Sequence, residues 1–309
     1  MMGTTHTHLL TAYVGCIFAA ATLTACGETE NADAGTDSSA LNMLTARERD
    51  QGWELLFDGE STQGWRGYNK AAFPDRGWEV QDGDLVVLAS DGSEEGLGGD
   101  IVTTEIFDNF ELSLEFLVTP GANSGILYRI IEKPGAEMWE NAPEFQVLDD
   151  SAYIAMGTMD MHKHLTGDNY DLHASVASAS KPLGEWNHAR ILVDGGHVEH
   201  WLNGQKTVEY ELWSAEWDSL VANSKFSEFA EYGQARSGPI GIQDHGHLVK
   251  YRNIKVRRLS RAISVSDGSV SGAMPDHDYS YARIGFAATR VPCLSFVSFI
   301  TATTSSTNL

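Results

Sequence analysis

Apolar and polar residues alternate along much of the chain between Trp53 and Leu259. In the segment NFELSLEFLV every second residue from Phe110 to Val118 is apolar, and Glu111, Ser113 and Glu115 lie on the opposite face. Successive side chains of a strand point to opposite faces, so this segment predicts a half-buried β-strand whose apolar face is formed by Phe110, Leu112, Leu114, Phe116 and Val118. Asp-Gly and Asn-Gly pairs separate other β-rich runs, as in QDGDLVVL and HVEHWLNG, and predict hairpins. Many antiparallel strands at this spacing predict an all-β sandwich or jelly roll.

One segment breaks the strand pattern. SAEWDSLVANSKFSEFAEYG has apolar residues near helical spacing and Gly233 as a stop, so we interpret residues 216–232 as a helical insertion between two strands. A structured loop is the alternative. After Leu259 the alternation ends, and residues 261–309 are predicted to be a disordered tail, with an aberrant read-through end as the alternative.

The first 26 residues have the character of an export signal. An apolar stretch, shorter than the ~20 residues that a membrane-spanning helix needs, is followed by LTAC, which resembles a bacterial lipobox ending at Cys26. We therefore expect residues 1–26 to be a lipoprotein signal peptide with lipidation of Cys26. The start MMGTTHTHLL lacks the usual Lys or Arg, which leaves a plain signal peptide or an uncleaved anchor as alternatives.

The segments after the signal predict a tethered, exported domain. Residues 27–48 lack periodicity and read as a flexible tether, and residues 49–260 form the predicted domain. This organisation predicts a periplasmic or cell-surface lipoprotein that touches the membrane only through its lipid. The predicted domain contains no cysteine, so it cannot rely on disulfides.

The net charge of the chain disfavours the recognition of some classes of binding partner. With 21 Lys and Arg against 43 Asp and Glu, the formal net charge is -22. Such a chain repels phosphate backbones and anionic headgroups, so nucleic acid is not an expected partner.

Polar residues inside the predicted strands indicate where chemistry could lie. In PIGIQDHGHLVKYRNIKV, Gln243 and His245 share one face, while Ile242 and Asp244 share the other. Asp244 is expected to satisfy turn or backbone donors. A buried polar group without a partner costs ~1 to 3 kcal/mol, so Gln243 and His245 face either water or a polar hollow.

Two further strands carry polar residues on a chosen face. Glu144 and Gln146 share a face in PEFQVLDD, and His200 lies on the face of Val198 and Leu202 in HVEHWLNG. If these faces line one concave sheet, the polar side chains converge on a common site.

Eight segments in order resemble the bacterial family of 3-keto-disaccharide hydrolase domains. They are GWELLFDGESTQGWRGY, GWEVQDGDLVV, NFELSLEFLVTPGANSGILYR, PEFQVLDD, YDL, GEWNHARI, HWLNGQ and GPIGIQDHGHLVKYRNIKV, which together run along the whole body from Trp53 to Leu259. The resemblance implies a concanavalin A-like jelly roll. Family members often carry a His-Pro-Asp type loop where this chain reads SAYIAMGTMDMHKHLTGDN, so the choice between His162 and His164 for the family's His stays open.

The family's chemistry implies cleavage of glycosides that a partner oxidoreductase has oxidised at C3. The ketone acidifies the C2 proton, a base removes it, and the enolate expels the C1 oxygen before water adds. Such a reaction needs a base, an electrophile for the enolate oxygen and an acid for the leaving group. Carboxylates and His suffice, and a divalent metal ion is an option open to the same ligands. No nucleotide cofactor is expected.

The resemblance suggests roles for nine side chains. The catalytic candidates are Asp171, His162 and Glu144, with Asp171 or His162 as the base. Four residues are expected to bind sugar hydroxyls or a metal: Glu144, Gln146, His200 and His245. Three more are expected to bind sugar: Arg129, Gln243 and Trp201.

Three other functions compete with this reading. A carbohydrate-binding module could use the same fold without turnover, because fold does not fix function. A retaining glycosidase needs two carboxylates about 5 Å apart, and the Glu-x-Asp-x-x-Glu strand typical of such jelly-roll enzymes is absent. A structural surface lipoprotein would need no polar residues on inward faces.

Overall fold

A computed structural model describes residues 41–90, 96–158, 160–176 and 178–260. The predicted signal peptide with Cys26, most of the predicted tether and the predicted tail lie outside these residues. Within the part of the chain that is described, no helix has the length and apolar character needed to cross a bilayer.

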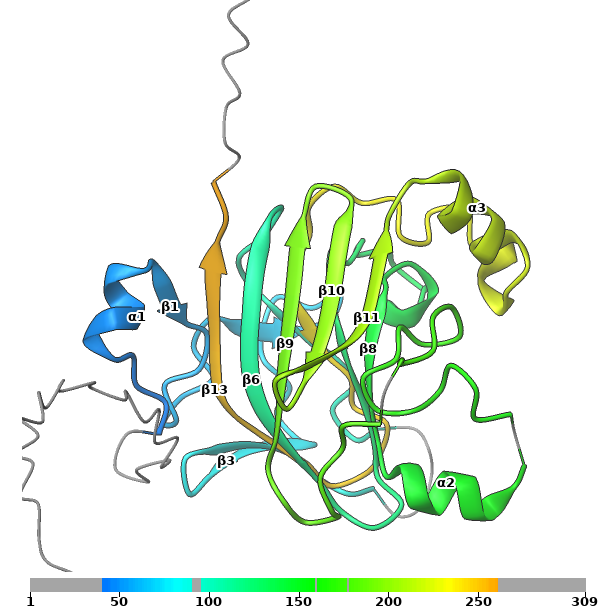
Figure 1. Ribbon diagram of the computed structural model, residues 1–309. Helices are drawn as coiled ribbons and strands as arrows, with labels where there is room; N and C mark the ends of the chain where they lie inside the picture. Colours follow the sequence, from blue (N-terminus) through cyan, green and yellow to red (C-terminus); the bar gives the residue numbers. More distant parts are fainter. Residues whose placement is uncertain (1–40, 91–95, 159, 177, 261–309) are drawn as a thin grey trace, which may run out of the picture. The chain divides into compact units, whose positions relative to one another are not determined.

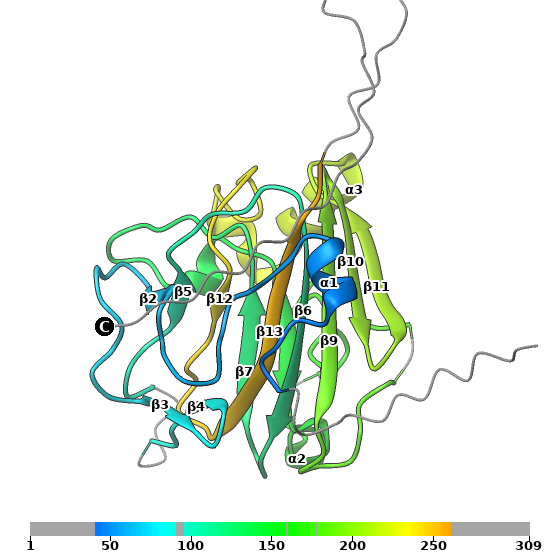
Figure 2. The same ribbon diagram turned by 90° about the vertical axis from the view of Figure 1, so that its left-hand side faces the viewer.

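The described strands form two antiparallel sheets (Figure 1). The larger sheet has eight strands in the order β11-β10-β9-β6-β13-β4-β3, with β1 also paired to β13. Its strands are β1 (Trp53–Leu55), β3 (Trp78–Gln81), β4 (Asp84–Val87), β6 (Phe110–Val118), β9 (Asn187–Asp194), β10 (His197–Leu202), β11 (Gln205–Glu211) and β13 (Val249–Arg258). The smaller sheet, visible beside it in Figure 2, has the order β2-β5-β12-β7-β8. Its strands are β2 (Trp65–Gly67), β5 (Ile101–Thr103), β7 (Asn123–Leu127), β8 (Glu144–Leu148) and β12 (Gly241–Ile242). Two sheets of this kind confirm the predicted all-β sandwich.

The hydrophobic core lies between the sheets. The apolar face of β6, from Phe110 to Val118, is buried as its alternation predicted, and it meets Ile126, Phe145 and Val147 of the smaller sheet. The polar face of β6 points away from the core and is neutralised by cations of neighbouring strands: Glu115 accepts from Arg252 Nε at 2.7 Å. Burial of one face is therefore what fixes the register of this strand.

Short helices lie at the edges of the sandwich. They are α1 (Ala46–Asp50), η2 (Met138–Glu140), α2 (Asp150–Met156), α3 (Ala215–Ala222) and η3 (Lys225–Glu228). The predicted helical insertion between β11 and β12 is confirmed, but it is two short helices, because Ser214 and Ser224 each cap a new start. Gly233 follows with a φ of +65°.

Stacked aromatic rings hold this insertion against the sandwich. Phe226 stacks on Tyr232 at 3.8 Å, Tyr232 on Trp217 at 5.9 Å, and Trp217 on Tyr210 of β11 at 5.4 Å. His173 closes the column on Tyr210 at 4.7 Å. Such contacts add to burial of the rings, so η3 is fixed relative to β11.

One residue of the predicted tether packs against the sandwich. Asn42, placed in the predicted tether, is 6% exposed and exchanges two hydrogen bonds with Asn253 of β13, at 2.7 and 2.8 Å. Its side chain also donates to the Gly83 carbonyl at 2.8 Å. A polar residue such as Asn42 can be part of a folded domain when its amide groups form hydrogen bonds with the backbone. A hydropathy pattern does not detect such bonds.

Candidate active site

A groove lies on the face of the smaller sheet that points away from the core. It consists of two adjoining cavities of about 170 and 350 Å³ that share Asn123, Gln146, Tyr170 and His245. The smaller cavity is completed by Trp139, Glu144, Lys225 and Gln243. The larger one is completed by Leu148, Tyr153, Met156, Thr158 and His164. One end of the groove is therefore charged and polar, and the other is more apolar.

Strand alternation explains why polar groups gather here. β7 and β8 pair antiparallel, with Gly125 opposite Gln146, and their other faces contribute Ile126, Phe145 and Val147 to the core. The outward positions Asn123, Glu144 and Gln146 must then face the groove. Asn123 Oδ1 is buried and has no hydrogen-bond partner among the described residues, so it is available to a ligand.

Gln243 and His245 reach the groove from the segment after β12. β12 and β13 belong to different sheets, so residues 243–248 cross from one layer of the sandwich to the other. Asp244 points the opposite way, where its carboxylate accepts hydrogen bonds from the backbone N–H groups of Gly98 at 2.9 Å and Gly246 at 3.1 Å. The predicted division of this segment into a groove-facing pair and a structural carboxylate matches these positions.

Glu144 is the carboxylate of the groove. It is the one Asp or Glu among the described residues that line either cavity, and it is 6% exposed. Burial raises its pKa to about 8, the nearby Lys225 cation opposes this rise, and the charge of Asp100 adds to it. A carboxyl group with such a pKa can take up a proton near neutral pH, which suits a general base.

His164 and Asp171 form a pair at the groove wall. His164 Nε2 lies 3.1 Å from Asp171 Oδ1, and His164 Nδ1 lies 2.6 Å from the carbonyl oxygen of Asp160. Asp171 Oδ2 accepts from the backbone N–H of Lys225 at 3.3 Å. Both ring nitrogens and both carboxylate oxygens are therefore engaged, and the pair joins the 160–171 segment to the helical insertion.

His162 lies elsewhere. It is exposed, it lines neither cavity, and its backbone N–H donates to Asp160 Oδ1 at 3.0 Å. The structure therefore corrects the expectation that His162 faces the substrate. The turn at residues 162–163, in which the His164 N–H donates to the Met161 carbonyl at 3.1 Å, instead brings His164 to the groove.

His200 is a core residue rather than a groove residue. Its face is the one shared with Val198 and Leu202, as predicted, but that face belongs to the larger sheet and looks into the core. His200 is 0% exposed, with Nε2 at 2.8 Å from the Tyr128 hydroxyl, and burial lowers its pKa to about 3. The expected sugar contact is thus corrected to an internal hydrogen bond.

Arg129 and Trp201 are also placed away from the groove. Arg129 is 2% exposed and donates from Nη1 to the Gly195 carbonyl at 2.7 Å, so it ties β7 to the β9–β10 turn. Trp201 lies on the outer face of the larger sheet, with Arg190 over its ring at 4.9 Å. Arg129 is thus a buried structural residue that follows β7, and Trp201 belongs to the other sheet, so neither makes the expected sugar contact.

The groove contains residues that the sequence did not single out for the site. Lys225 is the most informative of them, because it is a cation beside Glu144; Tyr170 and Asn123 are the others. Tyr170 and Asn123 lie in the quoted segments YDL and PGANSGILYR, so adjacency to the motif residues could have indicated them. Trp139 lines the groove and also packs edge-on against Phe229 at 5.4 Å.

The groove contains side chains of the types that could bind the predicted metal ion. Glu144, His245 and the amides are oxygen and nitrogen donors of the type that divalent ions accept. Among the described residues, however, the one group of three His, Cys, Asp or Glu ligand atoms within 4.8 Å of one another is His197, Glu199 and Glu209, far from these strands on the larger sheet. The groove residues do not present a preformed three-ligand site, so the ion stays a prediction and no step is assigned to it.

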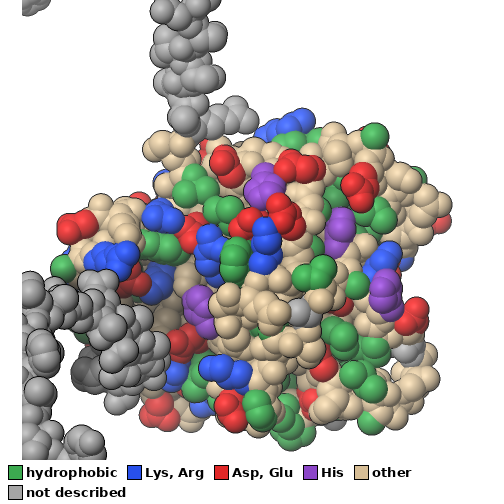
Figure 3. Space-filling view, in the orientation of Figure 1, with side chains coloured by type: hydrophobic (Ala, Val, Ile, Leu, Met, Phe, Trp, Pro, Cys, Tyr) green, Lys and Arg blue, Asp and Glu red, His purple; other side chains and the backbone are tan. Residues whose placement is uncertain are grey.

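The cluster on the larger sheet is accounted for by ion pairs. Lys206 Nζ lies 3.2 Å from Glu199 and also contacts Glu209, and His197 Nδ1 lies 2.7 Å from Glu211. Figure 3 shows acidic, basic and His side chains intermixed over this face. A lysine among the carboxylates already compensates their charge.

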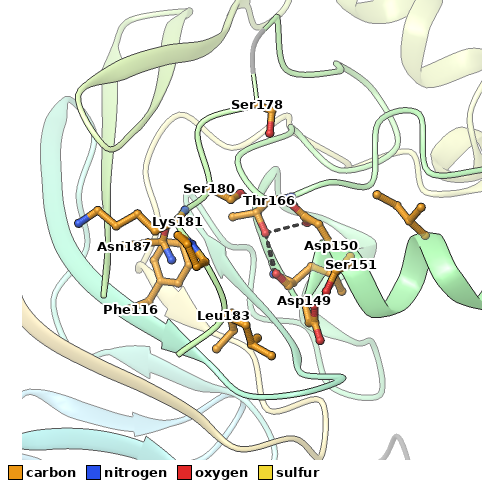
Figure 4. Close-up of a pocket in the computed structure, with 14 residues that line it drawn as sticks. Phe116, Asp149, Asp150, Ser151, Thr166, Ser178, Ser180, Lys181, Leu183 and Asn187 are labelled. Atoms are coloured by element: carbon orange, nitrogen blue, oxygen red, sulfur yellow. Dashed lines mark hydrogen bonds between the residues drawn. The ribbon is translucent and has the colours of Figure 1, made fainter. Parts of the chain in front are cut away.

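A further cavity of about 280 Å³ lies beside the start of α2 (Figure 4). Its acids are used by the fold: Asp149 caps α2 through the Ala152 N–H, and Asp150 accepts from the Thr166 N–H at 2.8 Å and from the Ser180 hydroxyl at 3.1 Å. Both carboxylates are therefore engaged in holding loops together.

Comparisons with known proteins identify related sequences and structures. Residues 52–257 match the family described as "3-keto-alpha-glucoside-1,2-lyase-like domain". A 3-keto-disaccharide hydrolase of Bacteroides thetaiotaomicron is 34% identical over 283 residues, which cover 80% of this chain and 97% of that protein. A crystal structure of a candidate glycosyl hydrolase from Parabacteroides distasonis has a TM-score of 0.64 and 33% identity, covering 71% of this chain and 100% of the other. A second such structure from the same organism has a TM-score of 0.52 and 29% identity, covering 67% and 99%.

Proposed function

The chain belongs to the family of 3-keto-alpha-glucoside-1,2-lyase-like domains, and we propose that its groove cleaves the glycosidic bond of sugars that carry a ketone at C3. Membership makes the chain an enzyme of the hydrolase or lyase type. The observation that carries the proposal is Glu144, a buried carboxyl with a raised pKa at the charged end of the groove.

Glu144 removes the C2 proton. A ketone at C3 acidifies this proton, and a carboxylate whose pKa lies near the working pH is an efficient base for it. The sequence suggested Asp171 or His162 for this role, whereas Asp171 is engaged by His164 and by the Lys225 N–H, and His162 is exposed. The proposal therefore moves the base to Glu144.

Loss of the proton starts an elimination. The C2–H electron pair forms a C2=C3 bond, and the charge passes to the C3 oxygen. The carbonyl then re-forms, a C1=C2 bond forms, and the C1–O bond breaks. The leaving oxygen takes a proton from His245 in this proposal, which is supported by the position of His245 in both halves of the groove. Water adding to the unsaturated sugar completes net hydrolysis.

Amides and an aromatic ring bind the sugar. Gln146, Gln243 and the unpartnered Asn123 Oδ1 supply donors and acceptors for hydroxyls. Trp139 offers a ring face at the charged end of the groove.

Two elements of the proposal come from the sequence and the family's chemistry. The ketone has to be supplied by an oxidation at C3, so a sugar 3-oxidoreductase is the functional partner. Lipidation of Cys26 would hold the domain at a membrane surface on the periplasmic or outer side.

NMR in D₂O tests the function. The full-length protein is incubated with methyl 3-keto-α-glucoside and, separately, with methyl α-glucoside. We expect methanol release from the oxidised sugar alone, with deuterium entering at C2. Glu144→Gln should abolish both signals, while Glu185→Gln, a change at an exposed loop position, should leave them intact.

Two other outcomes are informative. Shifts induced by the unoxidised sugar without cleavage of either compound would overturn the proposal in favour of a carbohydrate-binding module. A chelator arm tests the predicted ion, which is confirmed if turnover disappears and returns on adding a divalent cation.

A further inference from the structure

We infer that Lys225 is a catalytic residue whose ammonium group donates a hydrogen bond to the C3 oxygen and holds the negative charge of the enolate. This inference rests on the proposed function. It adds the electrophile that C2 proton removal requires and that the sequence did not supply.

The position of Lys225 is the first argument. It lines the same small cavity as Glu144, so a sugar ring in that cavity touches both groups. C2 and C3 are bonded to each other, and a base at C2 needs the charge-stabilising donor on the adjacent carbonyl. A carboxylate and a cation side by side match these two demands.

The partners of Lys225 are the second argument. Its Nζ lies 4.1 Å from the ring centre of Tyr170, 4.8 Å from that of Trp139 and 5.2 Å from that of Phe226. Its Nζ forms no ion pair with any carboxylate in the part of the chain that the structure describes. The residue is exposed as a whole, yet its ammonium group lies among aromatic rings, and the loss of water lowers its pKa while Glu144 and Asp171 oppose this. The hydrogen-bonding capacity of the ammonium group is thus left for a ligand.

The third argument is that the backbone of Lys225 is held in a fixed position. It is the first residue of η3, its neighbour Phe226 ends the stacked aromatic column, and its backbone N–H is held by Asp171 Oδ2 at 3.3 Å. A donor fixed before the substrate arrives stabilises developing charge without reorganisation. The His164–Asp171 pair and the aromatic column therefore act as positioning elements for this lysine.

The step conserves atoms and electrons. Breaking C2–H places an electron pair in C2=C3 and a negative charge on the C3 oxygen, which Lys225 Nζ–H stabilises by a hydrogen bond. Re-forming the carbonyl returns that pair to expel the C1 oxygen. Lys225 neither gains nor loses a covalent bond, and no oxidant or reductant is consumed.

Lys225→Met in the full-length protein tests the inference. Removing one such donor costs roughly 10²- to 10³-fold in kcat in comparable sites, and we expect a loss of that size with KM changed by less than about threefold. Deuterium exchange at C2 should fall in parallel, because enolate formation itself is impaired. Lys225→Arg, which keeps the charge, should recover part of the loss.

The matched control is Lys133→Met. Lys133 is also exposed and pairs with Glu231 just beyond η3 at 2.8 Å, but it lies outside the groove. We expect this variant to keep the parent kcat, and both variants to keep the parent melting temperature.

Three results would overturn the inference. Wild-type kcat in Lys225→Met would remove its catalytic role while leaving the proposed function intact. A rise in KM alone would make Lys225 a binding residue. Borohydride trapping of a sugar adduct on Lys225 would replace the electrostatic role with an imine. Failure of the wild-type protein to cleave the 3-keto-glucoside is a separate outcome that rejects the proposed function itself.

Discussion

Gly125 lies directly beneath the carboxyl group of Glu144. A Cβ built on Gly125 would stand 2.1 Å from Glu144 Oε1 and 2.7 Å from its Cδ. No positive φ requires glycine at this position, so space for the carboxyl group is the reason for it. The position of the Glu144 carboxyl group therefore depends on the absence of a side chain at Gly125.

Gly125→Ala should therefore displace Glu144 from the groove floor. We expect kcat to fall at least tenfold, since a small misplacement of a catalytic group can cost about 10²-fold. The measurement is turnover of a 3-keto-glucoside alongside thermal unfolding.

Gly121→Ala separates this effect from backbone strain. Gly121 has a φ of +73° with nothing within 4 Å of a built Cβ. Alanine there should cost about 1 kcal/mol of stability through its backbone alone and leave turnover unchanged. Full activity in Gly125→Ala would show that Glu144 need not occupy its present position.

The pH dependence of turnover should report Glu144. A base must be ionised to accept a proton, and burial raises the pKa of this carboxyl to about 8. We expect kcat/KM of the wild-type protein to rise with pH and level off above about 8. A profile that is flat between pH 6 and 9, or one that falls, would argue against Glu144 as the base.

Stability should respond to Glu144 in the opposite sense. Its folded pKa is raised from 4.5, so between pH 4.5 and 8 the folded state binds more protons than the unfolded state, and stability falls as pH rises through this window. Each unit of such a shift corresponds to ~1.4 kcal/mol. Glu144→Gln removes the ionisable group, and we expect it to melt at a higher temperature than the wild-type protein at pH 8. Equal melting temperatures at pH 8 would mean that the carboxyl is better solvated than its burial indicates.

Asp171 provides the comparison between the two candidate bases. In Asp171→Asn the amide oxygen can still accept from the Lys225 N–H or from His164, but it cannot serve as a base. If Asp171 only positions other groups, kcat should fall less than about tenfold, whereas Glu144→Gln should lose essentially all turnover. His162→Ala should match the wild-type protein. Complete loss of turnover in a folded Asp171→Asn variant would restore the assignment made from the sequence.

Strand alternation correctly predicted which side chains share a face of a strand, but it did not predict to which sheet each strand belongs. The apolar face of β6 is where the pattern put it, because a period of two depends only on the local backbone. Gln243 and His245 both line the groove as expected, although they follow β12 and do not lie within a strand. His200 shows the limit of this reasoning. Its face was right, but a strand of the larger sheet turns that face into the core, and sheet order is set by pairings distant in the sequence.

The position of Lys225 in the groove could not be predicted from the hydrophobic pattern, for a related reason. It lies in the helical insertion, which the sequence does reveal, but its approach to Glu144 depends on the aromatic column that joins Phe226, Trp217 and Tyr210. Those contacts link segments whose packing has no local signature. A strand-by-strand reading could therefore find the floor of the groove but not the residue that closes its side.

His200 offers a test of the division between core and groove. His200→Ala removes the hydrogen bond to Tyr128 and leaves a cavity beside Phe145, so we expect a loss of about 2 to 4 kcal/mol in the free energy of unfolding. Turnover at a temperature where the variant is folded should stay within about threefold of the wild-type value, because the ring lines neither half of the groove.

The pH dependence of this loss identifies its cause. Burial holds the folded pKa of His200 at about 3 against an ordinary value of 6.5, so below pH 6.5 the unfolded state binds the extra proton and stability falls as pH is lowered toward 3. The wild-type protein should consequently lose its advantage over His200→Ala on acidification from pH 7 to 5, as measured by denaturant unfolding at each pH. A pH-independent difference for His200 would mean that packing alone accounts for its contribution, and a large loss of turnover in the folded variant would place it back among the sugar-binding residues.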